Sequence, residues 1–314
     1  MQLKIEHRTQ YAYDPEVGRV SLRLRLFPAA FAGQMINRWS VTVNGEPVTP
    51  LLTDGFGDGV GLWHAKRSSD VIEILAEGLV TTEDRAGVVR GLSQMPPAGI
   101  FLSQTKLTAP DSRIRDLAHA VPDGQALDRL HALMAAVGEA MTYKPAATTA
   151  KTTAAEALSG GAGVCQDYSH VFMSAARVLG IPARYVTGYV LASHVSTNDA
   201  HSAATSGPET GSAADKANEG PDEGPDEGIV ETHAWAEAYA DGLGWVGFDP
   251  VHAVSPTDAY VRLACGLDAN AAAPIRGCLS TPSDVTMETA VVVLANGAQV
   301  QSQSQSQSEA QSQS

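Results

Sequence analysis

The chain has 314 residues, of which 44% are hydrophobic, so it is long enough for two domains with substantial cores. Its formal net charge of −14 argues against nucleic acid as a partner. No apolar run reaches 18 residues, which argues against insertion into a membrane. The N-terminal sequence MQLKIEHRTQYAY lacks the apolar core of a secretory signal, so we expect a cytoplasmic protein.

Residues 1–90 show the pattern of an all-β, sandwich-like domain. Stretches such as LKIEHRTQYAY, GRVSLRLRLFP and DVIEILAEGLVTT alternate between apolar and polar residues or are rich in β-branched residues, as strands are. The turn-forming sequences VNGEP and DGFGDG separate these strands. No constellation of reactive side chains stands out here, so we expect the chemistry elsewhere.

The pattern changes in residues 100–295, where helices come first and strands afterwards, as in an α+β domain. Apolar residues at helical spacing predict one amphipathic helix over residues 125–141. A second helix is predicted over residues 165–179, because Gly180 and Pro182 then give a stop signal. The later strands are predicted in the sequences ARYVTGYVLA, THAWAEAYA, GWVGFDP and VTMETAVVVLA.

Two segments have the composition of disordered chain. The insertion at 193–229 is polar, acidic and rich in glycine and proline, and it carries much of the net charge. We favour a solvated spacer over a lid or a tether for a basic partner. The tail at 296–314 is a low-complexity run of glutamine and serine.

The chain has three cysteines, an odd number without CxxC spacing, which favours neither a disulfide framework nor a structural zinc site. A free cysteine is usually a small core residue. Cys165 differs because it follows the glycines of GAGVC and begins a predicted helix, whose positive end stabilises a thiolate. We expect the glycines to let a substrate approach the sulfur. Cys165 is therefore a candidate nucleophile.

A thiolate nucleophile needs a base, and the base needs an orienting group. In HAWAEAY the alternation places His233 on one strand face and the alanines on the other, so the strand can lie close to the helix. The next strand ends in Asp249, and the hairpin between them would bring this carboxylate beside the imidazole. His233 is the predicted base and Asp249 the predicted orienting group. His252, just after the second strand, is the second choice of base.

A metal site built from His170, His233, His252 and Asp167 is an alternative, but their spacing is not compact. We therefore expect no metal and no cofactor. For Asp167 we favour a role at the helix start over a catalytic one. The sequence predicts no oligomeric state.

The sequences GVCQDYSHVFMSAARVLGIPARYVTGYV, HAWAEAY and GWVGFDP, in this order, resemble the core of the transglutaminase-like superfamily. The N-terminal IEHRTQYAYDPEVGRVSLRLRLFP resembles the β domain of its bacterial members, so the likeness covers roughly residues 1–295. The resemblance implies a papain-like core in which a nucleophile helix packs on an antiparallel sheet. The family's Cys, His and Asp positions are Cys165, His233 and Asp249 here.

The resemblance also implies an acyl-transfer enzyme that works through a thioester on protein or peptide amides. Such an enzyme is a transglutaminase if an amine accepts the acyl group, and a cysteine peptidase or amidase if water does. The resemblance tilts the expectation weakly toward hydrolysis. The backbone N–H of Cys165 is a predicted oxyanion donor, and Tyr143 is a candidate supporting residue. The alternative is a catalytically silent protein-interaction module on the same fold.

Overall fold

The computed structural model describes residues 1–93, 95–191, 194, 232–280 and 283–295. Except for residue 194, the predicted insertion at 193–229 and the tail at 296–314 lie outside these residues. Within the described ranges, no helix has both the length and the apolar character needed to cross a membrane.

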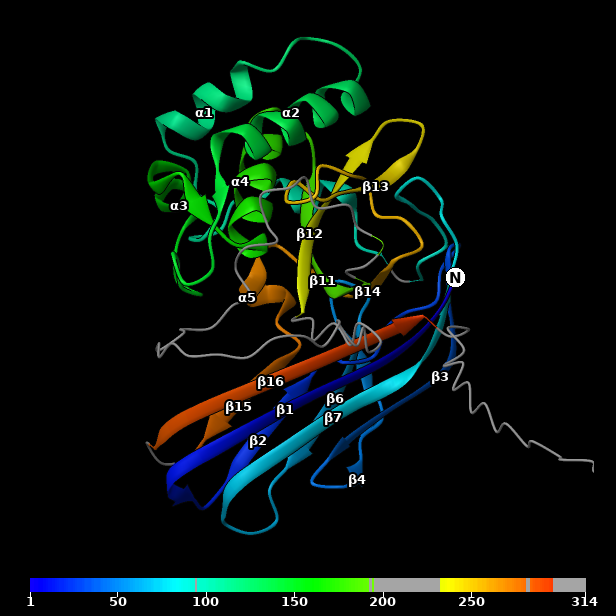
Figure 1. Cartoon of the computed structure of the whole chain (residues 1–314), viewed down its shortest axis with the longest axis vertical. Coiled ribbons are helices and arrows are strands. Elements are labelled where there is room, and N and C mark those ends of the chain that lie inside the picture. Colours follow the sequence, from blue (N-terminus) through cyan, green and yellow to red (C-terminus); the bar gives the residue numbers. More distant parts are fainter. Residues whose placement is uncertain (94, 192–193, 195–231, 281–282, 296–314) are drawn as a thin grey trace, which may run out of the picture.

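Two antiparallel sheets form the β module at the bottom of Figure 1. The first sheet has the order β16-β1-β7-β3-β4, with strands β1 (Gln2–Val17), β3 (Gln34–Val43), β4 (Glu46–Pro47), β7 (Ser69–Thr82) and β16 (Asp284–Ala295). The second has the order β15-β2-β6-β5, with strands β2 (Val20–Leu24), β5 (Leu52–Thr53), β6 (Gly59–His64) and β15 (Ile275–Leu279). Alternate residues of both sheets are buried in one apolar cluster, which includes Leu3, Ile5, Leu22, Leu24, Ile72 and Val291. The predicted sandwich-like β region is confirmed.

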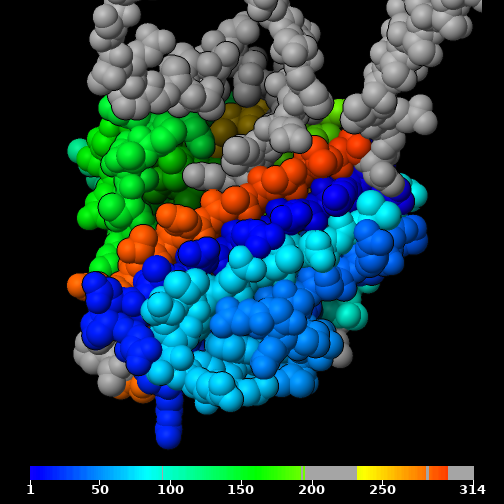
Figure 2. All heavy atoms as spheres, turned by 60° about the horizontal axis from the view of Figure 1, so that its bottom comes forward, coloured from blue at the N-terminus to red at the C-terminus, as the bar shows by residue number. Residues whose placement is uncertain are grey.

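The last two strands of the described chain return to this β module. β16 pairs with β1 from Leu3 opposite Ala295 to Asp14 opposite Asp284, and β15 pairs with β2. Figure 2 shows β16, β1, β7 and β3 side by side on one face. The sequence pattern assigned residues 100–295 to the α+β domain. In the structure, residues 275–279 and 284–295 pair with strands of the β module. The partners of these strands lie more than 250 residues away, so local patterns do not reveal them.

The second region is an α+β domain, as predicted. Its antiparallel sheet has the order β14-β11-β12-β13-β8, with strands β8 (Val88–Val89), β11 (Ala183–Val190), β12 (His233–Ala240), β13 (Gly244–Phe248) and β14 (Tyr260–Gly266). Its helices are α1 (Ser112–His119), α2 (Ala126–Ala140), α3 (Ala154–Gly160), α4 (Cys165–Val178), α5 (Ala269–Ala272) and the 3₁₀ helix η1 (Ala98–Leu102). A short parallel pair, β9 (Thr142–Tyr143) and β10 (Ala162–Gly163), leads into α4.

The core sheet is buried on both faces, because it lies between the helices and the β module (Figure 1). On one face, the alanines of β12 pack against α4 in a cluster that includes Tyr168, Val171 and Phe172. On the other face, Trp235 of β12 joins the apolar cluster of the β module. Because alanine side chains are small, α4 can lie close to β12. The first residue of α4, Cys165, therefore lies near the first residue of β12, His233.

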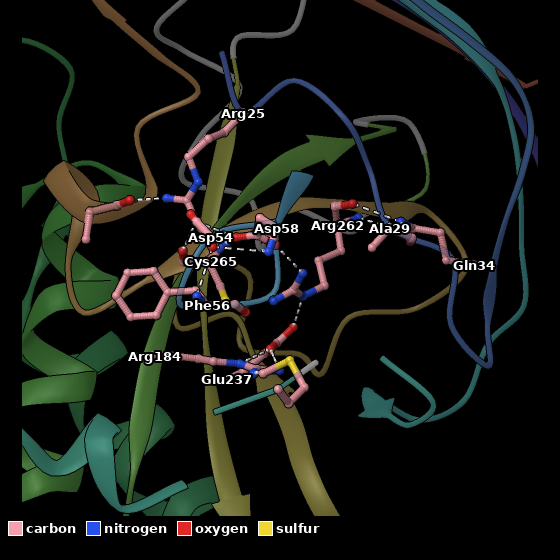
Figure 3. Close-up of polar contacts among 12 residues, drawn as sticks. Arg25, Ala29, Gln34, Asp54, Phe56, Asp58, Arg184, Glu237, Arg262 and Cys265 are labelled. Carbon is pink, nitrogen blue, oxygen red and sulfur yellow. Dashed lines mark hydrogen bonds and ion pairs between the residues drawn. The ribbon is translucent and has the colours of Figure 1, made fainter. Parts of the chain in front are cut away.

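Buried ion pairs also join the β module to the core sheet (Figure 3). Arg25, which follows β2, pairs with Asp58 before β6. The same Asp58 lies 3.5 Å from Arg262 of β14, and Arg262 donates a 3.0 Å hydrogen bond to Glu237 of β12. Glu237 also accepts a 2.6 Å hydrogen bond from Arg184 of β11. Each of these five charged side chains is at least 95% buried, so the charges depend on one another for compensation.

Candidate active site

The helix α4 begins at Cys165, as predicted, and a neighbouring carboxylate fixes its first turn. Asp167 is buried and accepts hydrogen bonds from the Val164 N–H at 2.9 Å and from the Thr148 hydroxyl at 2.6 Å. Burial raises the pKa of Asp167 above its usual value, and the hydrogen bonds from Thr148 and Val164 oppose that shift. Asp167 therefore orders the helix start.

The glycines before Cys165 serve the backbone of this turn. Gly161 ends α3 in the left-handed conformation, at φ 63°, which favours glycine. A Cβ atom on Gly163 would lie 2.6 Å from Oδ2 of Asp167, so glycine is needed for the carboxylate to fold back over the chain. The expectation that these glycines open an approach for substrate misses this reason, because the space beside Gly163 is filled by Asp167.

His233 and Asp249 are brought together by the hairpin of β12 and β13. His233 is the first residue of β12, and Asp249 directly follows β13. Nε2 of His233 lies 2.7 Å from Oδ2 of Asp249, and both side chains are buried. Nε2 is thus the nitrogen that donates to the carboxylate, which leaves Nδ1 for Cys165, the other hydrogen-bonding partner of this imidazole.

The charges of this cluster favour an imidazolium. Burial lowers the pKa of His233, but the charge and hydrogen bond of Asp249, together with the hydrogen bond and charge of Cys165, outweigh it and raise the pKa to about 10. For Asp249, burial raises the pKa, and the charge and hydrogen bond of His233 overcome this and hold it far below its usual value. At neutral pH the geometry therefore suits a cationic His233 between the Asp249 carboxylate and the Cys165 sulfur.

The Cys165 N–H belongs to the first turn of α4, whose N–H groups have no acceptor within the helix. Because the Val164 N–H donates to Asp167, the Cys165 N–H is the next backbone donor at the positive end of the helix. Tyr143, the candidate supporting residue, pairs with Gly163 in the short sheet that precedes α4. The Cys165 N–H therefore stays the predicted oxyanion donor, and Tyr143 lies on the strand beside the segment that leads into α4.

Two further side chains gather at Asp249. His252 Nδ1 lies 2.7 Å and the Tyr260 hydroxyl 2.8 Å from the same Oδ2 that bonds His233. His252 was the second choice of base because it follows the strand that ends at Asp249, and the structure places it on Asp249 together with His233. Nothing in the sequence pointed to Tyr260, because its proximity depends on β14 pairing with β11.

Metal binding is best judged at His233, Asp249 and His252, whose ligand atoms lie within 4.8 Å of one another. Two imidazoles and a carboxylate suit zinc. However, the cation would have to displace the proton of His233, whose pKa of about 10 makes that costly at neutral pH. Of the other two proposed ligands, Asp167 accepts hydrogen bonds from Val164 and Thr148 at the helix start. His170 is buried and accepts the Ala269 N–H at 3.0 Å. Burial lowers its pKa to about 4, so it is a neutral structural residue.

Comparisons with known proteins agree with this architecture. Residues 115–250 match the model of the transglutaminase-like superfamily, and residues 3–81 match that of the bacterial transglutaminase-like N-terminal region. An uncharacterized protein of Mycobacterium leprae is 24% identical over 91% of this chain and 98% of its own length. An uncharacterized protein of Mycobacterium tuberculosis H37Rv is also 24% identical, over 90% of this chain and 88% of its own.

A crystal structure of a candidate cysteine protease from Cytophaga hutchinsonii has the same fold. It matches with a TM-score of 0.66 and 20% sequence identity, over 94% of this chain and 91% of that protein. The likeness therefore includes the β module as well as the core. With both regions matched in their usual order, the chain belongs to the transglutaminase-like superfamily and carries the N-terminal region of its bacterial members.

Proposed function

We propose that this protein is a thiol-dependent acyl-transfer enzyme that acts on protein or peptide amides. Cys165 is the nucleophile, His233 the acid and base, and Asp249 the group that orients His233. The observation that carries the proposal is the 2.7 Å bond between His233 and Asp249, with Cys165 at the start of α4 as the second partner of the imidazole. Nucleophile, base and orienting group in this relation are the usual arrangement for covalent acyl transfer.

In the first half of the reaction, the Cys165 thiolate attacks the amide carbonyl carbon and forms a C–S bond. The negative charge moves to the carbonyl oxygen, which the Cys165 N–H can stabilise at the positive helix end. The imidazolium of His233 then gives its proton to the leaving amine as the C–N bond breaks. A thioester on Cys165 and a neutral His233 remain, with Asp249 holding the ring.

In the second half, neutral His233 takes a proton from the acceptor while the acceptor attacks the thioester. The C–S bond breaks and Cys165 leaves as a thiolate, which restores the starting state. Water as the acceptor gives hydrolysis, and a primary amine gives a new amide. Both outcomes use the same three residues, and we favour hydrolysis.

An open cleft of about 710 Å³ between the 144–152 segment and α3 gives room for a peptide. Lys144, Thr148 and Ala162 are among the residues that line it. Ala162 lies in β10, three residues before Cys165. Thr148 ties the wall of the cleft to Asp167 through its 2.6 Å hydrogen bond. A polypeptide in this cleft would lie along α3 and the segment that leads into α4, although Cys165 and His233 are not among the residues that line it.

Alkylation by iodoacetamide tests whether Cys165 is activated. Cys265 is buried and burial raises its pKa, whereas Cys278 is exposed, so Cys278 is the internal reference for an accessible thiol. In the native protein at pH 7, Cys165 should be alkylated faster than Cys278, and His233→Ala should abolish the difference. Equal or slower alkylation of Cys165 would contradict the proposal.

The reaction type follows from incubating the protein with a glutamine-containing peptide, with and without a primary amine, and analysing the products by mass spectrometry. Cleavage or deamidation alone supports hydrolysis, and amine incorporation supports transfer. Either activity should disappear in Cys165→Ala. A catalytically silent interaction module is the competing function, and it would show neither product nor preferential alkylation.

A further inference from the structure

The Asp249 carboxylate has more hydrogen-bond donors than orientation of His233 alone requires. One oxygen, Oδ2, receives His233 Nε2 at 2.7 Å, His252 Nδ1 at 2.7 Å and the Tyr260 hydroxyl at 2.8 Å. The other oxygen receives the backbone N–H groups of Val251 at 3.0 Å and His252 at 3.4 Å. Asp249 is completely buried, so these five donors are its replacement for water.

His252 lies beside the imidazole of His233. The centroids of the His233 and His252 rings are 5.0 Å apart, and the rings are tilted by 45°. Because a carboxylate only accepts, Nδ1 of His252 must be the donor, and the direction of its ring is set by Asp249. The side chain of His252 is 16% exposed and sits in the turn that Asp249 and Val254 close through two backbone hydrogen bonds.

We propose that His252, with Tyr260, is a positioning residue that fixes the Asp249 carboxylate in the orientation that His233 needs; this inference rests on the proposed function. The physical reason is the place of Asp249 after the end of β13, where the regular sheet no longer restrains the side chain. The backbone N–H groups of Val251 and His252 hold only Oδ1, so without the side chains of His252 and Tyr260 the bond to His233 would be the single restraint on Oδ2. Donors from two further directions add to that restraint, and a buried network of this kind strengthens each of its hydrogen bonds.

Tyr260 supplies the second direction from a different strand. It begins β14, and its ring packs edge-on against Trp235 at 5.5 Å and lies 6.1 Å from His233. Burial, together with the negative charge and hydrogen bond of Asp249, raises the pKa of Tyr260 far above its usual value, so its hydroxyl stays a donor. The carboxylate is thus held by the turn after β13 and by β14 at once.

Paired substitutions at His252 separate positioning from proton transfer. In His252→Asn, the side-chain amide nitrogen replaces Nδ1 and keeps a donor for Asp249, but the residue can no longer titrate. In His252→Leu, the volume is kept and the donor is lost. We expect His252→Leu to lower kcat about ten- to a hundred-fold with KM little changed, and His252→Asn to regain most of it. Activity is measured with the peptide substrate of the preceding assay.

A second readout needs no substrate. The NMR signal of the His233 Nε2 proton reports its bond to Asp249, and we expect it to shift in His252→Leu and to return toward its wild-type position in His252→Asn. If the peptide assay fails for the wild type, the proposed function fails, while the NMR comparison still tests the positioning. Tyr260→Phe, which removes another donor from the same oxygen, should move the His233 signal too, and it serves if His252→Leu does not fold.

Three results would overturn the inference. An Asn variant as inactive as the Leu variant, with the His233 signal restored, would assign His252 to proton transfer. A Leu variant with wild-type kcat and an unmoved signal would leave His252 without a role. A His233 signal that Tyr260→Phe does not move would remove the shared restraint on Asp249.

Discussion

The substitution Glu237→Gln tests how the ion-pair network between the β module and the core sheet stabilises the protein. Glu237 is 1% exposed, and its carboxylate accepts hydrogen bonds from Arg184 Nε at 2.6 Å and from Arg262 Nε at 3.0 Å. Glutamine preserves the size of the side chain, but it removes the charge and replaces one acceptor oxygen by a donor that faces a guanidinium. Arg262 would keep Asp58 at 3.5 Å. Arg184 would keep its contact with the Trp245 ring, whose centroid lies 4.0 Å away, without a carboxylate.

Removing one partner of a buried ion pair typically costs about 3–5 kcal/mol, because the other charge stays buried without compensation. Arg184 is fully buried and Arg262 is 4% exposed, so solvent cannot supply that compensation. With a urea m-value of about 3 kcal/mol per molar, this loss lowers the unfolding midpoint by about 1 to 1.7 M. The effect is a large share of the stability of a typical protein, which is about 5–15 kcal/mol.

Urea unfolding followed by tryptophan fluorescence measures the effect, and the chain offers a matched control. Glu46 forms a 2.7 Å ion pair with Lys66, and both side chains are exposed, so Glu46→Gln should leave the midpoint almost unchanged. In addition, Arg184→Met should cost less in the Glu237→Gln background than in the wild type, because it then removes an uncompensated charge. If Glu237→Gln unfolds at the same urea concentration as Glu46→Gln, the reasoning about this network is wrong.

Three further predictions concern the start of α4 and the charged pair beside it. Gly163→Ala should destabilise the fold by about 1–3 kcal/mol, because the new Cβ meets Asp167, whereas Gly160→Ala, with no atom within 4 Å, should be tolerated; thermal unfolding of both variants checks this. The pKa of His233 in the folded protein, about 10, exceeds that of an unfolded histidine, about 6.5, so its pairing stabilises the fold fully below pH 6.5 and is lost as the pH rises through 10. The stability difference between wild type and His233→Phe should therefore shrink from pH 6.5 to pH 10.5 in urea titrations, and a constant difference would contradict the assignment. Finally, Cys165→Ala should lower the pKa of His233 as followed by NMR, because the hydrogen bond and charge of Cys165 help to raise it; an unchanged pKa would separate the two residues.

The sequence was informative where the structure depends on neighbours along the chain. Cys165 at a helix start follows from a local pattern of glycines and apolar spacing, and the proximity of His233 and Asp249 follows from a tight hairpin between two strands. Even there, a further reason for glycine at position 163 was missed, because the fold of the Asp167 side chain back over Gly163 cannot be read from residue types.

The rest depends on which distant strands become neighbours. Alternation placed Glu237 on the face of β12 opposite the alanines, but only the sheet order puts Arg184 and Arg262 around it. Tyr260 reaches Asp249 for the same reason. The return of β16 to β1 requires a contact between the two ends of the described chain, which no local pattern specifies.

The two faces of β12 divide the support of the candidate site between the two regions of the protein. Its alanine face lets α4 approach, which brings Cys165 to His233, while its other face is held from the β module. Gln34 of β3 bonds the backbone of Arg262 in both directions, at 2.7 and 2.9 Å, and Arg262 lies two residues after Tyr260 on β14. The β module therefore holds the strand that supplies a donor to Asp249. On this argument the β module is part of what shapes the site, although none of its side chains belongs to the Cys165, His233 and Asp249 cluster.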